Sequence, residues 1–346
     1  MTKKAYDYLG CVIEVDSDES FQKLVRKNIE VLVEPEDIFG KLKVKTGNIG
    51  NIPFNKEFPY LKISENHEKD FYGVDHLRYG ILAKSIWKKS PSEYEVHTRM
   101  KNDDWIISKI FKKIFYVHPR SEKKSLLHSS GLQIENRGIL LSGMPWSGKT
   151  SLNVAFLDLI KDSRFLSEDE VFISRDKGGL RGYYVPGSVY ARFSVFAGSR
   201  KLEAVLEHPE MLDALQVFDN DTISRVIAHR RYDLNLGLSL SRESFCRVLG
   251  VGSIPEMEIK KLIFTEYSSE KSPHTKKLSK EEAIELLKKR DMPKEIALDR
   301  VSKRENVFEN ESSLLEPLLL EGVELLKVSY DAKRHLTKGF VEDLAV

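Results

Sequence analysis

The residues from Gly143 to Thr150 carry the strongest chemical signal in the sequence. They read Gly-Met-Pro-Trp-Ser-Gly-Lys-Thr and match the phosphate-binding pattern G-x-x-x-x-G-K-[ST]. Glycines in such a loop let backbone N–H groups turn toward phosphate oxygens. We expect Lys149 to reach the terminal phosphates and Thr150 to bind Mg²⁺ through its hydroxyl. The residues expected to contact a nucleotide are Gly143, Met144, Pro145, Trp146, Ser147, Gly148, Lys149, Thr150 and Ser151.

The sequence around this loop has the order that a phosphate loop requires. The apolar run 138–142 predicts a buried strand, and the apolar residues of 152–160 recur at helical spacing. The positive end of that helix would point at the bound phosphates. An ordinary strand-to-helix turn with a surface lysine is the alternative. Pro145 and Trp146 are bulky for a loop of this kind.

Three acidic residues, Glu168, Asp169 and Glu170, follow a short strand-like run about one helix length after the loop. Carboxylates bind Mg²⁺ directly or through water, and they also accept a substrate proton. A parallel neighbouring strand would bring these acids to the same carboxyl edge of the sheet as the phosphates. The alternative is a solvated acidic turn.

His128 stands before the strand that leads into the loop, within Leu126-Leu127-His128-Ser129-Ser130. A single histidine at such a place is either a satisfied structural residue or a group that contacts the transferred phosphate.

Together these residues resemble the HPr kinase/phosphorylase family and related P-loop kinases, whose core is similar to that of ATP-dependent phosphoenolpyruvate carboxykinases. The similar segments are 128–134, 137–151 and 165–171. The resemblance implies that His128 lies near the transferred phosphate and that Asp169 accepts the proton of the substrate hydroxyl. It further implies that Glu168 helps to hold the metal, and that the cofactors are ATP and Mg²⁺.

This chain departs from the family pattern in three places. Glu168 stands where family members usually carry an aspartate, and Pro145-Trp146 replaces small residues. Residues 1–120 do not resemble the usual N-terminal domain. The resemblance therefore does not identify HPr as the substrate, and the acceptor stays open.

We expect an ATP-dependent kinase that transfers the γ-phosphate to a hydroxyl, with Asp169, His128 and Lys149 as catalytic residues and Thr150 and Glu168 at the metal. The acceptor would be a serine of a protein or peptide, or a small molecule, and the sequence leaves open whether GTP, ADP or pyrophosphate replaces ATP as donor. One alternative is a regulatory switch that binds a nucleotide and transfers nothing. Another is a protein that keeps only the fold, with a decayed loop. Relatives of this type often assemble, so a homo-oligomer is left open.

The expected fold class is α/β, with a central P-loop domain at 121–268, an α+β N-terminal region at 1–120 and a helical C-terminal region at 269–346. The N-terminal region would bind a substrate or partner. Patterning predicts strands over 9–15, 40–47 and 259–265, and helices over 20–32 and 103–116. A capping pair, Ser279 and Glu282, predicts a helix start, and helical patterning continues through 314–326.

Composition excludes several classes of function. The 346 residues carry 55 Lys and Arg against 53 Asp and Glu, so no global basic field points to nucleic acid. No apolar stretch approaches the length of a membrane helix, and the polar start Met1–Asp7 is unlike a secretory signal. Two distant cysteines, Cys11 and Cys246, suit a reducing compartment. We expect a cytoplasmic protein.

Overall fold

The chain forms two compact units in the computed structural model. Unit 1 comprises Met1–Lys123, Pro186–Ser188 and Lys294–Val307, and unit 2 comprises Lys124–Val185, Val189–Pro293 and Phe308–Val346. The structure describes residues 1–9, 11–29, 32–33, 38–46, 61–66, 69–76, 81–90, 92–98, 110–111, 114–115, 118, 124–144, 146–176, 178–187, 189–196, 199, 207, 237–289 and 320–346. The fold is mixed α/β, as predicted, and each unit has its own large sheet.

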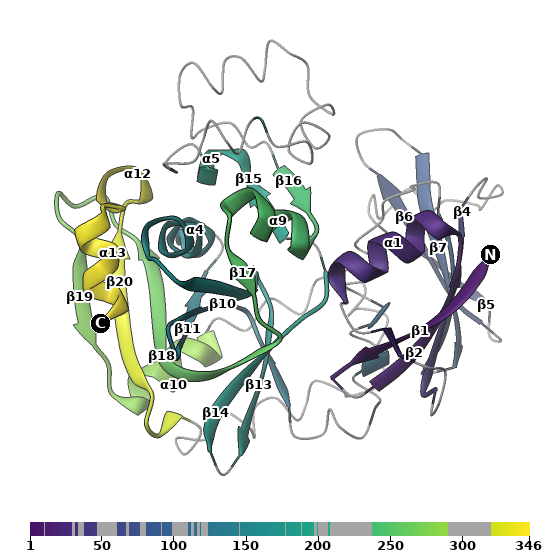
Figure 1. The fold of residues 1–346 in the computed structure, drawn as a ribbon, viewed down its shortest axis with the longest axis horizontal. Helices are drawn as coiled ribbons and strands as arrows, with labels where there is room; N and C mark the ends of the chain where they lie inside the picture. Colours follow the sequence, from purple (N-terminus) through teal and green to yellow (C-terminus); the bar gives the residue numbers. More distant parts are fainter. Residues whose placement is uncertain are drawn as a thin grey trace. The chain divides into compact units, whose positions relative to one another are not determined.

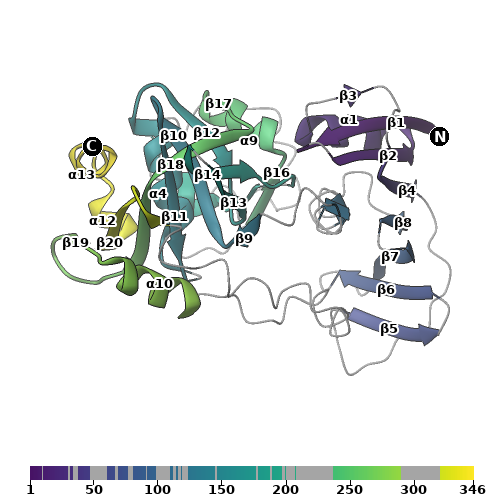
Figure 2. The ribbon, with the colours of Figure 1, turned by 90° about the horizontal axis from the view of Figure 1, so that it is seen from below.

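Unit 1 is built on an eight-stranded sheet with the order β3-β1-β2-β4-β8-β7-β6-β5, a succession that can be followed in Figure 2. Its strands are β1 (Thr2–Tyr8), β2 (Cys11–Ser17), β3 (Leu32–Val33), β4 (Gly40–Thr46), β5 (Leu61–Asn66), β6 (Lys69–His76), β7 (Ile81–Ser90) and β8 (Glu93–Thr98). Helix α1 (Glu19–Asn28) begins after the cap Asp18, whose side chain accepts from the Phe21 N–H.

The strands of unit 1 alternate between a buried and a polar face. In β2 every second residue from Cys11 to Ser17 is buried, whereas the lysines of β4 lie on the other face, where Lys45 pairs with Glu95 at 2.7 Å. Phe21 and Val25 of α1 are fully buried. The sheet is mixed, since β4 is parallel to both β2 and β8, and the period-two alternation of side chains along each strand explains this division between a buried and a polar face.

Sequence patterning predicted which strands and helices unit 1 contains more accurately than it predicted where they begin and end. The strand over 40–47 is confirmed as β4, and the strand expected over 9–15 begins at Cys11, because Leu9 occupies a turn with φ 53°. The helix expected through residue 32 ends at Asn28, since Leu32 pairs with Tyr6 in the sheet. The ends of the helix expected over 103–116 lie outside the described residues. Its apolar residues Ile110, Phe111, Ile114 and Phe115 are buried.

Unit 2 is built on a ten-stranded sheet in which β17-β12-β10-β11-β18-β14-β13-β9 form the main path and β19 and β20 extend it from β18 (Figures 1 and 2; β9 and β12 are labelled in Figure 2). The strands are β9 (Ser125–Leu127), β10 (Ser129–Ile134), β11 (Arg137–Gly143), β12 (Ser163–Ser167), β13 (Val171–Asp176), β14 (Gly179–Tyr184), β17 (Gly252–Ser253), β18 (Glu256–Tyr267), β19 (His274–Lys277) and β20 (Glu324–Tyr330). A separate pair joins β15 (Val189–Arg192) and β16 (Gly237–Leu240). The helices are α4 (Lys149–Leu159), α5 (Phe193–Phe196), α9 (Arg242–Leu249), α10 (Lys280–Lys289), α12 (Ala332–His335) and α13 (Lys338–Ala345).

Three parallel strands form the centre of this sheet. β11 pairs with β18, and β18 pairs with β20, all in the same direction. Their carboxyl ends therefore meet at one edge, where a ligand site is expected in an α/β sheet. The predicted strands over 138–142 and 259–265 are confirmed as parts of β11 and β18.

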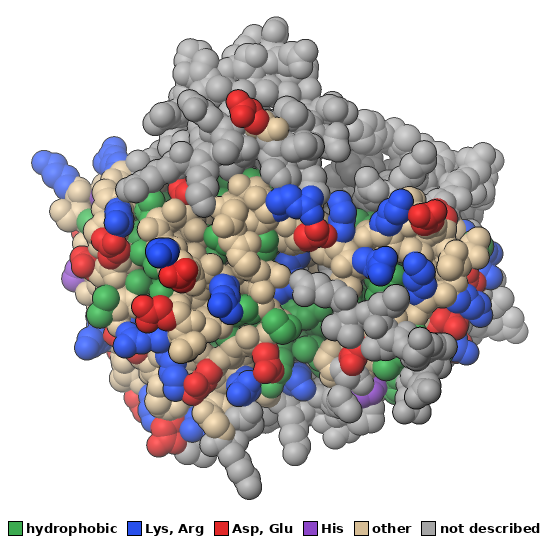
Figure 3. Space-filling model, in the orientation of Figure 1, with side chains coloured by type: hydrophobic (Ala, Val, Ile, Leu, Met, Phe, Trp, Pro, Cys, Tyr) green, Lys and Arg blue, Asp and Glu red, His purple; other side chains and the backbone are tan. Residues whose placement is uncertain are grey.

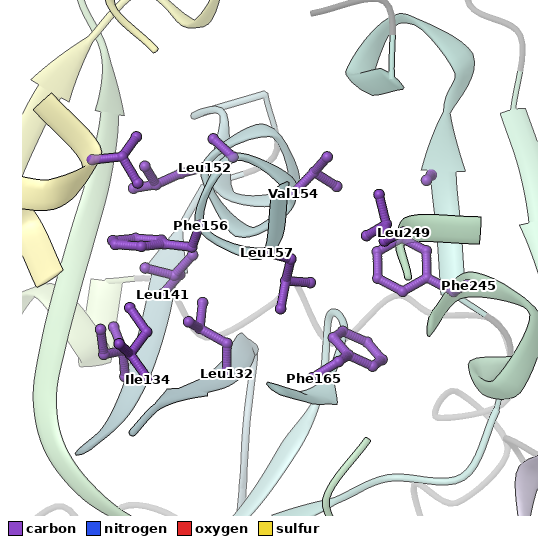
Figure 4. Packing of buried hydrophobic residues seen from close by; sticks show 14 of the residues in the cluster. Leu132, Ile134, Leu141, Leu152, Val154, Phe156, Leu157, Phe165, Phe245 and Leu249 are labelled. Carbon is purple, nitrogen blue, oxygen red and sulfur yellow. The ribbon is translucent and has the colours of Figure 1, made fainter. Parts of the chain in front are cut away.

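Helix α4 packs into the core of unit 2 beside β10, β11 and β12. Its apolar residues are buried almost around the whole helix. Figure 4 shows Leu152 and Phe156 of α4 close to Leu141 of β11, with Leu157 directed toward Phe165 of β12. The helix predicted after the loop is confirmed. Because α4 is packed into the core, the orientation of its first turn is fixed.

The C-terminal region does not match the helical tail that we expected. Helix α10 begins after Ser279, whose hydroxyl accepts from the Glu282 N–H while Glu282 accepts from the Ser279 N–H, so the capping prediction is confirmed. The helix expected through residue 326 is wrong at its end, because Glu324–Tyr330 is strand β20. From Leu326 to Tyr330 buried and partly exposed residues alternate, and that strand pattern outweighs the preceding run of leucines.

Charged side chains of both signs are interspersed over the face of the molecule seen in Figure 3. Among the helices that the structure describes, none is both long and apolar enough to cross a membrane.

Candidate functional site

The loop between β11 and α4 is held closely at both of its glycines. A side chain at Gly143 would collide with the hydroxyls of Ser147 and Thr265. Gly148 has φ 91° and caps α4, and a Cβ there would lie 2.6 Å from the Tyr330 hydroxyl. Both positions therefore require glycine for steric reasons, which is the role that the motif predicts.

Two neighbouring strands fix the shape of the loop. Ser147 Oγ and Thr265 Oγ1, at the end of β18, are hydrogen-bonded at 2.7 Å. The Tyr330 hydroxyl, at the end of β20, donates to the Gly148 carbonyl at 2.7 Å. Burial raises the pKa of Tyr330, so the hydroxyl keeps its proton for this bond. The sequence motif gave no sign of Thr265 or Tyr330, although each is a polar residue closing an apolar strand.

The start of α4 carries no side-chain hydrogen bond of the usual capping kind. Gly148 supplies no side-chain cap, so the positive end of the helix lies uncapped by a side chain beside Lys149. Two large apolar side chains of the loop are exposed, Met144 at 52% and Trp146 at 70%. Trp146 has φ 73°. Pro145 lies outside the described residues.

The acidic turn after β12 reaches the same edge of the sheet by another route than expected. β12 runs in the same direction as β11 but is not its neighbour, because β10 lies between them and pairs with both. The expectation of a directly adjacent parallel strand is therefore wrong. The turn itself is tight: the Glu170 N–H bonds to the Glu168 carbonyl at 2.8 Å, and Asp169 between them has φ 67°.

Three predicted catalytic residues meet at Lys149. Its Nζ lies 2.9 Å from Asp169 Oδ1 and 3.0 Å from His128 Nε2. His128 Nδ1 lies 3.4 Å from the same Asp169 oxygen. The Lys149 side chain is buried, whereas that of Asp169 is half exposed. Residues from three separate segments of the chain thus share one small volume.

The His128 ring is suited to accept a hydrogen bond. Burial, and then the Lys149 ammonium, lower the pKa of His128, although Asp169 opposes that shift. A neutral ring accepts through Nε2 from Lys149 and carries its proton on Nδ1, which lies near Asp169 but makes no hydrogen bond among the described residues.

Glu168 lies beside Thr150. The Thr150 hydroxyl donates to Glu168 Oε1 at 2.7 Å. Burial, and then the neighbouring Asp169 carboxylate, raise the pKa of Glu168 to about 7. This environment disfavours the carboxylate when no cation is near, so a cation bound there would relieve an electrostatic conflict.

The donors at this place suit Mg²⁺. A threonine hydroxyl and a carboxylate are hard oxygen ligands, and Mg²⁺ usually takes one or two such protein groups together with waters and phosphates. Within the described residues no cluster of three or more His, Cys, Asp or Glu forms an all-protein metal cage. Thr150 and Glu168 would therefore hold the cation only together with a phosphate ligand.

Comparisons with known proteins give little independent information. No model of a protein family matches the chain, and no curated protein matches it either. Among solved structures, the chain is similar to the HPr(Ser) kinase/phosphatase from Coxiella burnetii. The identity is 11% and the TM-score 0.29, over 64% of this chain and 95% of that one. So low a TM-score carries no argument about function, and the site must be judged on its own geometry.

Proposed function

We propose that this protein is a Mg²⁺-dependent kinase that moves the γ-phosphate of ATP to a hydroxyl group. The observation that carries the proposal is the meeting of Lys149, His128 and Asp169 within 3.4 Å of one another beside the uncapped start of α4. If Lys149 were a solvated surface lysine and the acidic turn a solvated one, the ammonium would not be buried between Asp169 and His128, which come from separate segments of the chain. The acceptor would be a serine of a protein or peptide, or a small molecule.

Each residue has a role that follows from its position. The loop N–H groups and Lys149 would hold the phosphates, since both carry positive charge where the anion binds. Thr150 and Glu168 would hold Mg²⁺, which when bound would offset charge on the phosphates. His128 would contact the phosphoryl oxygens.

Asp169 would act as the proton acceptor. The hydroxyl oxygen of the acceptor forms a bond to the γ-phosphorus, and the bond from that phosphorus to the bridging oxygen of ADP breaks. The hydroxyl proton passes to the Asp169 carboxylate, which is exposed enough to meet an acceptor. Most of the rate would come from positioning and charge stabilisation.

The nucleotide site is tested by calorimetry with Mg-ATP on the wild type and Lys149→Ala. We expect Lys149→Ala to lose at least about tenfold in affinity, because one charge-assisted contact to phosphate contributes about 1.5–3 kcal/mol. Lys161→Ala is the matched control, since Lys161 is an exposed lysine beyond the other end of α4. Equal binding by wild type and Lys149→Ala would refute the phosphate loop.

A phosphoryl-transfer assay with Asp169→Asn distinguishes a kinase from a regulatory switch. Labelled ATP and cell extract serve as donor and acceptor source, and mass spectrometry identifies the phosphorylated product. Asp169→Asn should lower transfer about 10²–10⁴-fold, as expected for loss of a general base, while it still binds Mg-ATP. Binding without transfer by the wild type would support a switch.

A further inference from the structure

Trp146 combines two features that an ordinary loop residue would avoid. Its backbone has φ 73°, in the left-handed region, and its side chain is 70% exposed. A bulky residue at positive φ is a steric outlier, whereas glycine occupies that region without strain. The exposed ring gains little burial energy that could offset the strain. Backbone strain of this kind persists only where the surrounding structure fixes the conformation, and it is frequent in segments that hold ligands.

The position of Trp146 connects this ring to the phosphate loop. It precedes Ser147, which is anchored to Thr265, and stands three residues before Lys149. The indole therefore projects from the same anchored loop that carries Lys149, and it lies outside the buried core cluster of unit 2. Met144, exposed at 52%, adds a second apolar side chain to the same loop.

We propose that Trp146 binds the nucleoside part of the donor by stacking its indole against the planar base. This inference rests on the proposed function. The phosphates are accounted for by loop N–H groups, Lys149 and the metal ligands, none of which recognises a base. The base is the aromatic surface that is covalently joined to those phosphates, and aromatic side chains stack on bases of every kind. A hydroxyl acceptor of unspecified class offers no comparable match to an indole.

The test compares binding of Mg-ATP with binding of Mg-tripolyphosphate, which has the phosphates without the base. Calorimetry is carried out on the wild type, Trp146→Ala, Trp146→Gly and Trp146→Phe. We expect Trp146→Ala and Trp146→Gly to lose about tenfold in ATP affinity, as for loss of one stacked base, and to bind tripolyphosphate within about twofold of the wild type. Trp146→Phe should retain most of the ATP affinity.

Thermal unfolding of the same variants tests the strain. Trp146→Gly should raise Tm above that of Trp146→Ala by about 2–4 °C, because only glycine relieves the left-handed backbone. Glu135→Gly is the matched control: Glu135 also has positive φ, at 52°, in the turn between β10 and β11. Glu135→Gly should raise Tm above that of the wild type, because it also relieves a left-handed backbone, and it should leave ATP affinity unchanged.

Each outcome decides one question. A wild type that binds neither ligand refutes the proposed function and this inference with it. A wild type that binds both ligands, with Trp146→Ala equal to it or weakened equally for both, refutes the base contact alone and leaves the kinase proposal standing. Weakening confined to ATP supports the stacking role.

Discussion

At the scale of single residues, the site gathers a buried ammonium and a carboxyl group whose charged form is disfavoured. Lys149 is buried with one carboxylate and one neutral ring as its partners, and Glu168 is held where its carboxylate form is disfavoured. A phosphate and a divalent cation bring the opposite charges to both places. The electrostatics of the described residues therefore favour a ligand that carries the two together.

A buried tyrosine in unit 1 gives a prediction about pH. Tyr6 is fully buried and its hydroxyl donates to Gln22 Oε1 at 2.6 Å; burial raises its pKa from 10.0 to about 12, although Arg26 opposes the shift. A pKa raised in the folded state means that stability is complete below pH 10 and falls as pH rises toward 12. The loss attributable to Tyr6 is roughly 1.4 kcal/mol per pH unit in that window.

The measurement is the near-ultraviolet absorbance of tyrosinate in the wild type and Tyr6→Phe at about pH 11, between the two pKa values. The folded proteins should show equal tyrosinate absorbance, and denaturant should reveal one extra ionised tyrosine in the wild type. Tyr6→Phe should be less stable at neutral pH by about 1 kcal/mol, for the lost hydrogen bond, and this deficit should shrink as pH rises. An extra tyrosinate in the folded wild type would contradict the prediction.

At the scale of elements, the sequence predicted what local patterns determine. The order of β11, loop and α4 follows from an apolar run, two glycines and helical spacing, and Lys149, Thr150, Glu168 and Asp169 do come together as the order implied. Patterns did not predict that β10 separates β11 from β12, because strand order depends on pairings between distant segments. They also missed Tyr330, whose contact with Gly148 spans 182 residues.

The contact between β20 and the loop leads to a prediction for Tyr330→Phe. The substitution removes the hydroxyl that donates to the Gly148 carbonyl and keeps the buried ring. We expect Mg-ATP affinity to fall about two- to tenfold, the equivalent of one hydrogen bond, because the loop loses part of its fixed shape. Calorimetry measures it.

Tyr267→Phe is the control for this substitution, since Tyr267 ends the adjacent strand β18 and is 61% exposed. It should bind as the wild type does. A Tyr330→Phe variant with unchanged affinity would show that the loop keeps its shape without this bond, and that Tyr330 serves only the packing of the core.

At the scale of the whole molecule, the units are built from separated segments of the chain. Pro186–Ser188 and Lys294–Val307 belong to unit 1, although in the sequence they lie between segments of unit 2. The expected C-terminal region at 269–346 contributes β19 and β20 to the sheet of unit 2. Local composition and spacing contain no sign of such sharing. All described residues of the proposed site belong to unit 2, so a nucleotide should stabilise that unit directly.

This expectation can be measured because the three tryptophans divide between the units. Trp87 and Trp105 belong to unit 1 and Trp146 to unit 2, so fluorescence of Trp146→Phe reports on unit 1 alone. In that variant, Mg-ATP at about 100 times its Kd should raise the unfolding temperature of unit 2 by about 5–10 °C, the equivalent of about 2.7 kcal/mol. Circular dichroism follows both units, so the part of its transition that the fluorescence does not report should move to higher temperature, while the fluorescence transition stays in place. Ligand binding stabilises only the part of the structure that unfolds together with the site. A fluorescence transition whose midpoint rose by the same amount would therefore show that the two units unfold cooperatively.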